Sequence, residues 1–350
     1  MVRLRRFPAL FSGPAWGPAL VAGLGAVLPL TLGAVTQHPG FYWATLGALV
    51  AALANPLGRL GMAGLLLLIL LGACSVALGY GVAVHPLACA LLFAGAALAL
   101  VYLQWAGGEL AKLGFALALC LCFGQGRHGD GSFDNPAAIA TLFLLGGLWV
   151  ALLGFGLRGA HGLWMWQPLP DWTVLSRFAR RQRRAQASRL WTAGVLVAVL
   201  GGALAGFFAS HVDWSQSPWL TLPVFLLINL RWQRGWQRPL LAGLSLLALL
   251  ALLALLGYSL AGTPLMLLTA LPLSMLCRLF QARPYGLFAL QGALCLLLVS
   301  ETLSPDWSDP RWRLLNTALG IAIALGILFA IRLAGRLPGL SHRVQAHPLD

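Results

Sequence analysis

The amino-acid sequence predicts an all-α polytopic membrane protein with about twelve transmembrane helices, arranged as two parallel repeats of six. The first observation behind this prediction is composition. Of 350 residues, 59% are hydrophobic and 9% are charged, and the mean hydropathy is +0.83. A soluble domain carries about 25% charged residues because its surface faces water. This composition excludes a soluble globular enzyme. The placement of the basic residues and an internal duplication supply the other two observations.

Six apolar segments fill the first half of the chain, separated by polar residues, Pro or Gly. The first follows the basic start Arg3-Leu4-Arg5-Arg6, and its apolar run is long enough to favour an uncleaved helix over a signal peptide. Phe41-Tyr42-Trp43 opens the second segment, His85-Pro86 precedes the fourth, and Asn135-Pro136 precedes the sixth. The predicted spans are 15–35, 41–54, 62–80, 85–104, 110–124 and 137–157.

Six further apolar segments follow a polar stretch at 158–190. Their predicted spans are 191–210, 218–230, 239–260, 264–280, 284–302 and 314–333. The chain therefore divides into a first membrane repeat (1–157), a basic linker (158–190), a second membrane repeat (191–335) and a tail (336–350).

The basic residues predict the orientation of the chain. Of the 23 basic residues, all but three fall in segments predicted to lie on the same side of the membrane as the N-terminus. The exceptions are Arg127, Arg311 and Arg313. Cytoplasmic loops carry an excess of Lys and Arg, so we expect both termini to be cytoplasmic in a bacterial-type inner membrane. Because the basic residues lie between apolar runs, lipid headgroups are their expected partners and nucleic acid is not.

The linker at 158–190 combines Asp171 as a helix cap, an apolar face and the run Arg180-Arg181-Gln182-Arg183-Arg184. A basic amphipathic helix of this kind lies on an anionic membrane surface. Two interpretations remain open. The segment is either a linker held inside by its arginines or a surface that binds nucleic acid or a soluble partner.

Internal duplication is the most informative pattern. Asp134-Asn135-Pro136 and Asp309-Pro310 each precede a helix, and these helices contain Gly146-Gly147 and Gly320. Ala118-Leu119-Cys120-Leu121 recurs as the same tetrapeptide at 293–296, and the offset stays at about 174 residues throughout. Each half holds an even number of spans, so both insert in the same direction and relate by an axis along the membrane normal.

Few residues are candidates for binding or proton coupling. An ionisable residue at the edge of a span is costly and therefore a functional candidate, and Glu301 ends the eleventh span shortly before Arg311 and Arg313. The alternative is an interfacial ion pair. Further candidates on the inner side are arginines that could collect organic anions and asparagines at span ends: Arg59, Arg278, Arg283, Asn55 and Asn229.

The sequence contains no pattern that predicts catalysis, a metal or a cofactor. The six cysteines lie inside apolar stretches, as small buried hydrophobic residues do. Phosphate-binding loops, nucleophile elbows and zinc signatures are missing from the sequence. We therefore expect neither an enzyme nor ATP hydrolysis.

Several of these segments resemble the fusaric acid resistance (FUSC) and aromatic acid exporter superfamily. The resemblance rests on Phe41-Tyr42-Trp43-Ala44, Asn55-Pro56 and Arg59, on the second copy at Trp219 and Asn229, and on Arg311–Gly320. It implies a short two-repeat form without the large cytoplasmic domains of longer members. It also implies export of small aromatic or hydrophobic organic anions and a periplasmic membrane-fusion adaptor as partner. Without an ATPase motif, a proton gradient is the expected driving force.

A second hypothesis belongs to another class: a non-transporting membrane scaffold that recruits a partner through the basic linker. The scarcity of polar residues inside the spans favours it, because a polar substrate path usually leaves more of them. An adaptor gene beside this one would favour export. Assembly into a homo-oligomer is left open.

Overall fold

The structure is a computed structural model, and it describes residues 16–36, 38, 40–53, 61–106, 108–126, 135–158, 189–212, 217–229 and 310–334. All regular elements within these ranges are α-helices. An all-helical fold pairs most backbone hydrogen-bonding groups within the helices themselves, as a lipid environment requires. The helices are α1 (Trp16–Thr36), α2 (Phe41–Leu53), α3 (Gly61–Val82), α4 (Pro86–Ala106), α5 (Gly108–Gln125), α6 (Pro136–Arg158), α9 (Arg189–Ala209), α10 (Ser217–Asn229) and α14 (Pro310–Ala334).

These helices coincide with nine of the predicted spans to within a few residues. The other three predictions, at 239–260, 264–280 and 284–302, lie outside the described residues. The clearest difference is at α14, which begins at Pro310 rather than near 314 and therefore includes Arg311 and Arg313 in its first turn. Proline suits the first helical position because its fixed φ is helical and its missing N–H would have no helical partner there.

Helix α6 also begins with a proline. Pro136 is its first residue, and the Oδ1 atom of Asn135 accepts a hydrogen bond of 2.9 Å from the N–H of Ala137. This is a helix N-cap, which satisfies one of the backbone donors left free at a helix start.

Three described segments are long and apolar enough to cross a bilayer: Gly64–Val82, Pro86–Gln104 and Pro136–Leu157. Shorter apolar segments occupy the other described helices. The outward-facing side chains are also large and apolar, such as Leu87 and Leu91, each 75% exposed. Apolar helices with an apolar outer surface are suited to lipid.

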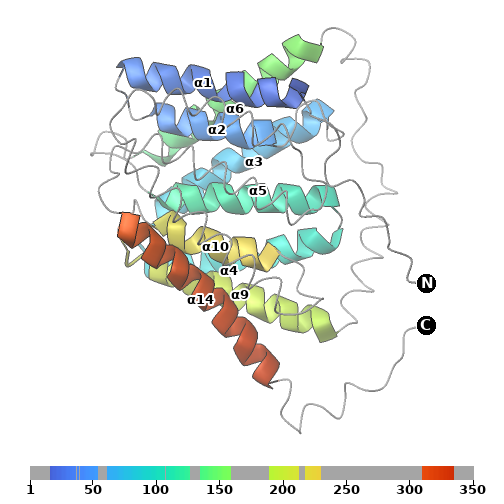
Figure 1. Cartoon of the computed structure of the whole chain (residues 1–350), viewed down its shortest axis with the longest axis vertical. Helices are drawn as coiled ribbons and strands as arrows, with labels where there is room; N and C mark the ends of the chain where they lie inside the picture. The colour runs from blue at the N-terminus through green and yellow to red at the C-terminus, as the bar shows by residue number, and fades with distance from the viewer. Residues whose placement is uncertain are drawn as a thin grey trace, which may run out of the picture.

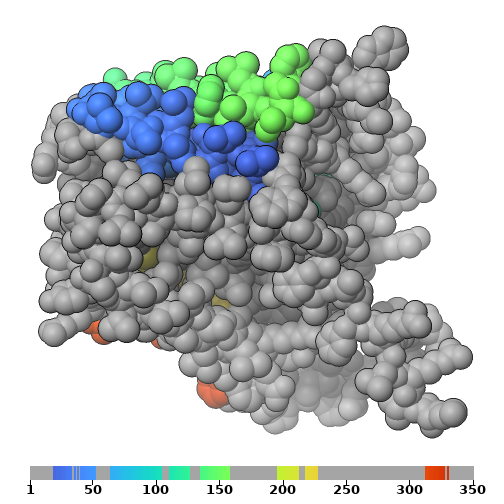
Figure 2. Space-filling model, turned by 45° about the horizontal axis from the view of Figure 1, so that its top comes forward, coloured from blue at the N-terminus to red at the C-terminus, as the bar shows by residue number. Residues whose placement is uncertain are grey.

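Most of the helices lie side by side with nearly parallel axes, whereas α14 is inclined to its neighbours (Figure 1). Two short helices are enclosed by the others. Helix α2 packs against α1, α3 and α6, and helix α10 packs against α9, α14, α5 and α4. Figure 2 shows α1 and α6 on one face of the molecule, where they cover the α2 side of the bundle.

The helix pairs α2–α6 and α10–α14 are packed backbone against backbone. A Cβ atom added at Gly146 of α6 would overlap the backbone of Ala44 in α2. In the same way, a Cβ atom at Gly320 of α14 would overlap the backbone of Leu220 in α10. Small residues allow such close approach, and it is a main source of helix association in membranes. The two glycines occupy equivalent positions in the predicted repeats.

Substitution at these contacts should separate the helices. We expect Gly146→Ala and Gly320→Ala each to lower the free energy of unfolding by about 1–3 kcal/mol, because the added methyl group meets a fixed backbone. Gly156→Ala in α6 and Gly326→Ala in α14 are matched controls, since no atom lies within 4 Å of a Cβ at either position. Thermal unfolding of the purified protein in detergent measures the difference. Equal effects at contact and control positions would contradict the packing.

Candidate functional site

Helices α2 and α10 correspond to each other in the predicted repeats. Each has 13 residues, and the seventh residue is Gly47 in α2 and Pro223 in α10. Interrupted hydrophobic segments at corresponding positions of two repeats mark binding sites in many transporters. Both helices are almost completely buried. The search for a site therefore begins with these two helices and the helices packed against them.

The two helices also share a Trp-x-Thr-Leu sequence that begins at Trp43 and at Trp219. Its threonines are fully buried, and each hydroxyl donates to the carbonyl one turn earlier. The Oγ1–O distance is 2.8 Å for Thr45 and 3.3 Å for Thr221. The recurrence of this short pattern is visible in the sequence, although only its tryptophans were recognised there as corresponding residues.

Pro223 changes the backbone chemistry of α10. Proline has no N–H, so the carbonyl of Trp219, four residues earlier, lacks the helical donor that it would otherwise have. A peptide carbonyl without its helical partner is a ready acceptor inside an apolar bundle. The interruption therefore adds one polar group to the buried part of α10.

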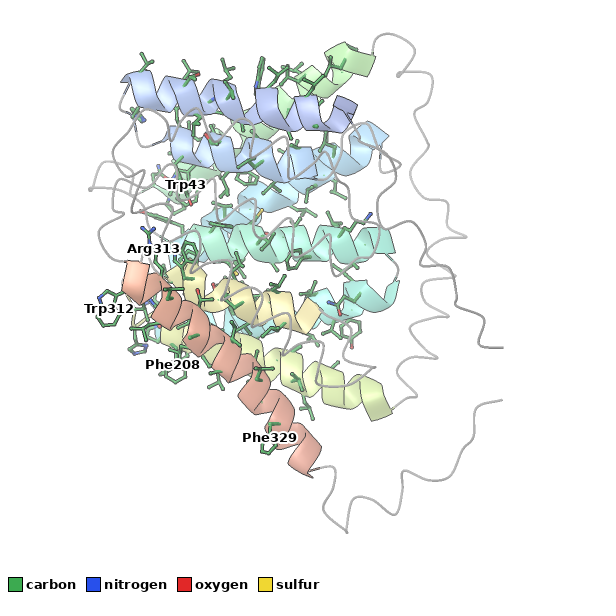
Figure 3. All side chains as sticks on the ribbon, viewed as in Figure 1. Trp43, Phe208, Trp312, Arg313 and Phe329 are labelled. Atoms are coloured by element: carbon green, nitrogen blue, oxygen red, sulfur yellow. The ribbon has the colours of Figure 1, made fainter. Side chains whose placement is uncertain are left out.

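Arg313 lies over the ring of Trp219. The Cζ atom of the guanidinium is 5.9 Å from the indole centroid, within the range of a cation–π interaction. The indole is 7% exposed, whereas Trp312, the preceding residue of α14, is 54% exposed. Figure 3 shows Trp312 projecting away from the bundle at the start of α14. The helix start therefore directs one aromatic side chain outward and one cation onto a buried indole.

The next turn of α14 contributes two buried polar side chains. Asn316 is 6% exposed and Thr317 is fully buried. Among the described residues, the Oγ1 atom of Thr317 is one of the few buried polar atoms without a hydrogen-bond partner. Leaving such a group unsatisfied costs about 1–3 kcal/mol, so its presence needs a reason. We call Trp219, Arg313, Asn316 and Thr317 the α10–α14 polar cluster.

Helix α5 brings further polar groups to the neighbouring surface of α10. The thiol of Cys122 lies beside the hydroxyl of Thr221, and just after the end of α5 a Cβ atom at Gly126 would lie 2.6 Å from the ring of Pro218. The Nε2 atom of Gln125 donates to the Sγ atom of Cys89 over 3.3 Å, whereas its Oε1 atom is buried without a partner. Polar contacts thus link α4, α5 and α10.

The structure places the side chain of one predicted site residue, Arg313, and brings it together with Trp219. Arg311 and Asn229 lie within α14 and α10, but their side chains are outside the description. Glu301, Arg59, Arg278, Arg283 and Asn55 also lie outside the described residues. In the sequence, Asn316 and Thr317 served only as part of the Arg311–Gly320 segment that resembles the family and were not proposed as site residues. Gln125 was missed, and its signal is a polar residue within an apolar helix.

The described part of the chain offers no group of three or more His, Cys, Asp or Glu side chains that could hold a metal ion. What the polar cluster does offer is one cation, one indole, one amide and one hydroxyl. These groups can hold an organic anion through charge, ring contact and hydrogen bonding.

Replacing Thr317 tests whether its hydroxyl is unsatisfied at rest. We expect Thr317→Val to leave the unfolding temperature unchanged or raise it, because valine keeps the volume and removes a buried group that has no partner. Thr221→Val, on the helix packed against it, should lower stability by about 0.5–1.5 kcal/mol, because its hydroxyl is bonded. Thermal unfolding in detergent separates the two. A larger loss for Thr317→Val would show that its hydroxyl is already paired.

Comparison with known proteins places the cluster inside a recognised segment. Residues 204–327 match the family described as fusaric acid resistance protein-like, a stretch that includes all of α10 and most of α14. No curated protein and no solved structure matches the chain. The match covers 124 of the 350 residues, and all of them lie in the second half of the chain.

Proposed function

We propose that this protein is an inner-membrane secondary exporter of aromatic or hydrophobic weak acids, driven by a proton gradient and working with a periplasmic adaptor. The observation that carries the proposal is the position of Arg313 over the buried indole of Trp219. The transport class and the substrate class are what the resemblance to this family implies, and these two side chains have the chemistry that such a substrate needs.

The polar cluster has the chemistry to bind such a cargo. A guanidinium forms short, charge-assisted hydrogen bonds with a carboxylate. The interaction is stronger in a low-dielectric site than in water. The adjacent indole of Trp219 gives an aromatic ring an apolar face, and Thr317 has a hydroxyl free to bond. A weak acid with a carboxylate and a ring offers a suitable partner to each of these three groups.

The packing of the helices supports a duplicated architecture for this exporter. Helix α6 meets α2 at Gly146 as α14 meets α10 at Gly320. In addition, α1 packs against both α2 and α6, and α9 packs against both α10 and α14. We propose two six-helix repeats related by an axis along the membrane normal, with contacts such as α4–α9 and α5–α10 between the halves. The site then lies on the second repeat beside that central interface.

Proton coupling is proposed for Glu301, which precedes Arg311 and Arg313 in the sequence. A carboxylate at the hydrocarbon boundary prefers its neutral form, and a nearby guanidinium favours the charged form. Cargo binding to the arginine would release the glutamate to take up a proton. This exchange links the movement of the anion to the movement of the proton.

Transport of labelled hydroxybenzoate into inverted vesicles under a proton gradient tests the proposal. We expect uptake above that of vesicles without the protein and at least a tenfold decrease for Arg313→Gln, since the variant removes the charge that holds the anion. Trp312→Leu is the matched control, because it alters the adjacent, exposed side chain and should change uptake less than twofold. Equal uptake with and without the protein, for a panel of aromatic acids, would contradict export and favour the scaffold.

Coupling is tested in the same vesicles. Glu301→Gln should abolish gradient-driven uptake, because glutamine cannot exchange the proton, while membrane insertion stays normal. Glu109→Gln should have little effect, since Glu109 is a carboxylate of the first repeat at the start of α5. Normal gradient-driven uptake by Glu301→Gln would reduce Glu301 to an interfacial ion-pair residue.

A further inference from the structure

The two equivalent helix pairs differ in polarity at corresponding positions. Gly146 and Gly320 fix the correspondence between α6 and α14, because each packs on the backbone of the equivalent short helix. On this alignment Arg313 corresponds to Ile139, Asn316 to Leu142 and Thr317 to Phe143. Every polar side chain of the α10–α14 polar cluster that comes from α14 thus has an apolar counterpart in α6.

The apolar counterparts also fill their space. Ile139 and Phe143 are both fully buried in the same hydrophobic cluster as Trp43. A Cβ atom at Gly47 of α2 would overlap the carbonyl of Phe143, so the two helices touch at this point. The first pair is therefore closed by hydrocarbon side chains and a backbone contact.

The short helices also differ in polarity, and again the second-half helix, α10, is the more polar one. Gly47 of α2 keeps the backbone N–H that Pro223 of α10 lacks, so the carbonyl four residues earlier has a helical donor in α2 and none in α10. The first residue is Phe41 in α2 and Ser217 in α10. The contrast therefore extends to the backbone.

We propose that the chain binds a single organic anion, at the α10–α14 polar cluster, and that the α2–α6 pair is its permanently closed structural counterpart. This inference rests on the proposed function and adds the number and location of the sites. A buried carboxylate without a partner costs several kcal/mol, and the α2–α6 pair places no cation or free hydroxyl at the corresponding positions to offset that cost. The polar cluster has both, and the Thr317 hydroxyl is buried without a partner. Helix α6 also holds a buried donor without a partner, the Nε1 atom of Trp149, so the cation is the feature that distinguishes the second pair.

Equilibrium binding of labelled 4-hydroxybenzoate to the purified, full-length protein in detergent tests the inference. We expect one saturable site per chain. Variants that carry first-half residues into the second half, Arg313→Ile and Asn316→Leu, should raise the Kd at least tenfold. They should remain folded, because the corresponding positions of α6 already hold these apolar residues. Ile139→Val is the matched control in the first half and should leave both the Kd and the stoichiometry unchanged.

Arg313→Lys is a second variant that tests binding if Arg313→Ile lowers the stability of the protein too far. Lysine retains the charge but lacks the planar guanidinium, so the Kd should rise while one site per chain remains. Two sites per chain, no saturable binding, or a Kd that responds to Ile139→Val and not to the α14 variants would each overturn the inference. Binding needs no gradient. One binding site per chain without transport would therefore contradict the exporter but not the single site. Transport with two binding sites per chain would contradict the single site but not the exporter.

Discussion

Close backbone contact through glycine in the α2–α6 and α10–α14 pairs is the constraint on which the rest of the structure depends. Helices α2 and α10 have 13 residues each, which corresponds to about 20 Å, whereas the hydrocarbon core of a bilayer is about 30 Å thick. Over its described residues each helix is shorter than that thickness, and each packs among longer helices. Gly146 and Gly320 let α6 and α14 approach near enough to hold them. A side chain at either position would push the pair apart and expose the buried helix.

This packing leaves the remaining contact positions free to differ. In the first pair they are filled by Ile139 and Phe143, which bury hydrocarbon against hydrocarbon. In the second pair Arg313 and Thr317 take these places, and a buried hydroxyl without a partner reduces stability. Groups that destabilise a resting fold are expected where a ligand later satisfies them. On the proposal made above, the first pair serves stability and the second recognition, although both pairs are in close backbone contact.

The sequence was sufficient to predict most helix positions, because apolar runs end at residues with a clear local role, such as Pro136 and the capping Asn135. It also singled out Arg313 from its position beside an apolar span. It could not predict that Thr317 is buried, since a helix that is apolar on all sides does not reveal which face meets its neighbours. The same reason hides the contact between Gln125 and Cys89, which joins two helices that are separated along the chain. The coupling role of Glu301 stays a prediction.

An experimental structure with bound hydroxybenzoate tests the central claim most directly, because it locates the ligand without assuming a mechanism. The account predicts ligand density beside the guanidinium of Arg313 and against the indole of Trp219, with the space between α2 and α6 empty of ligand. Density between α2 and α6, or at the predicted inner arginines Arg59 and Arg278 in place of Arg313, would contradict it.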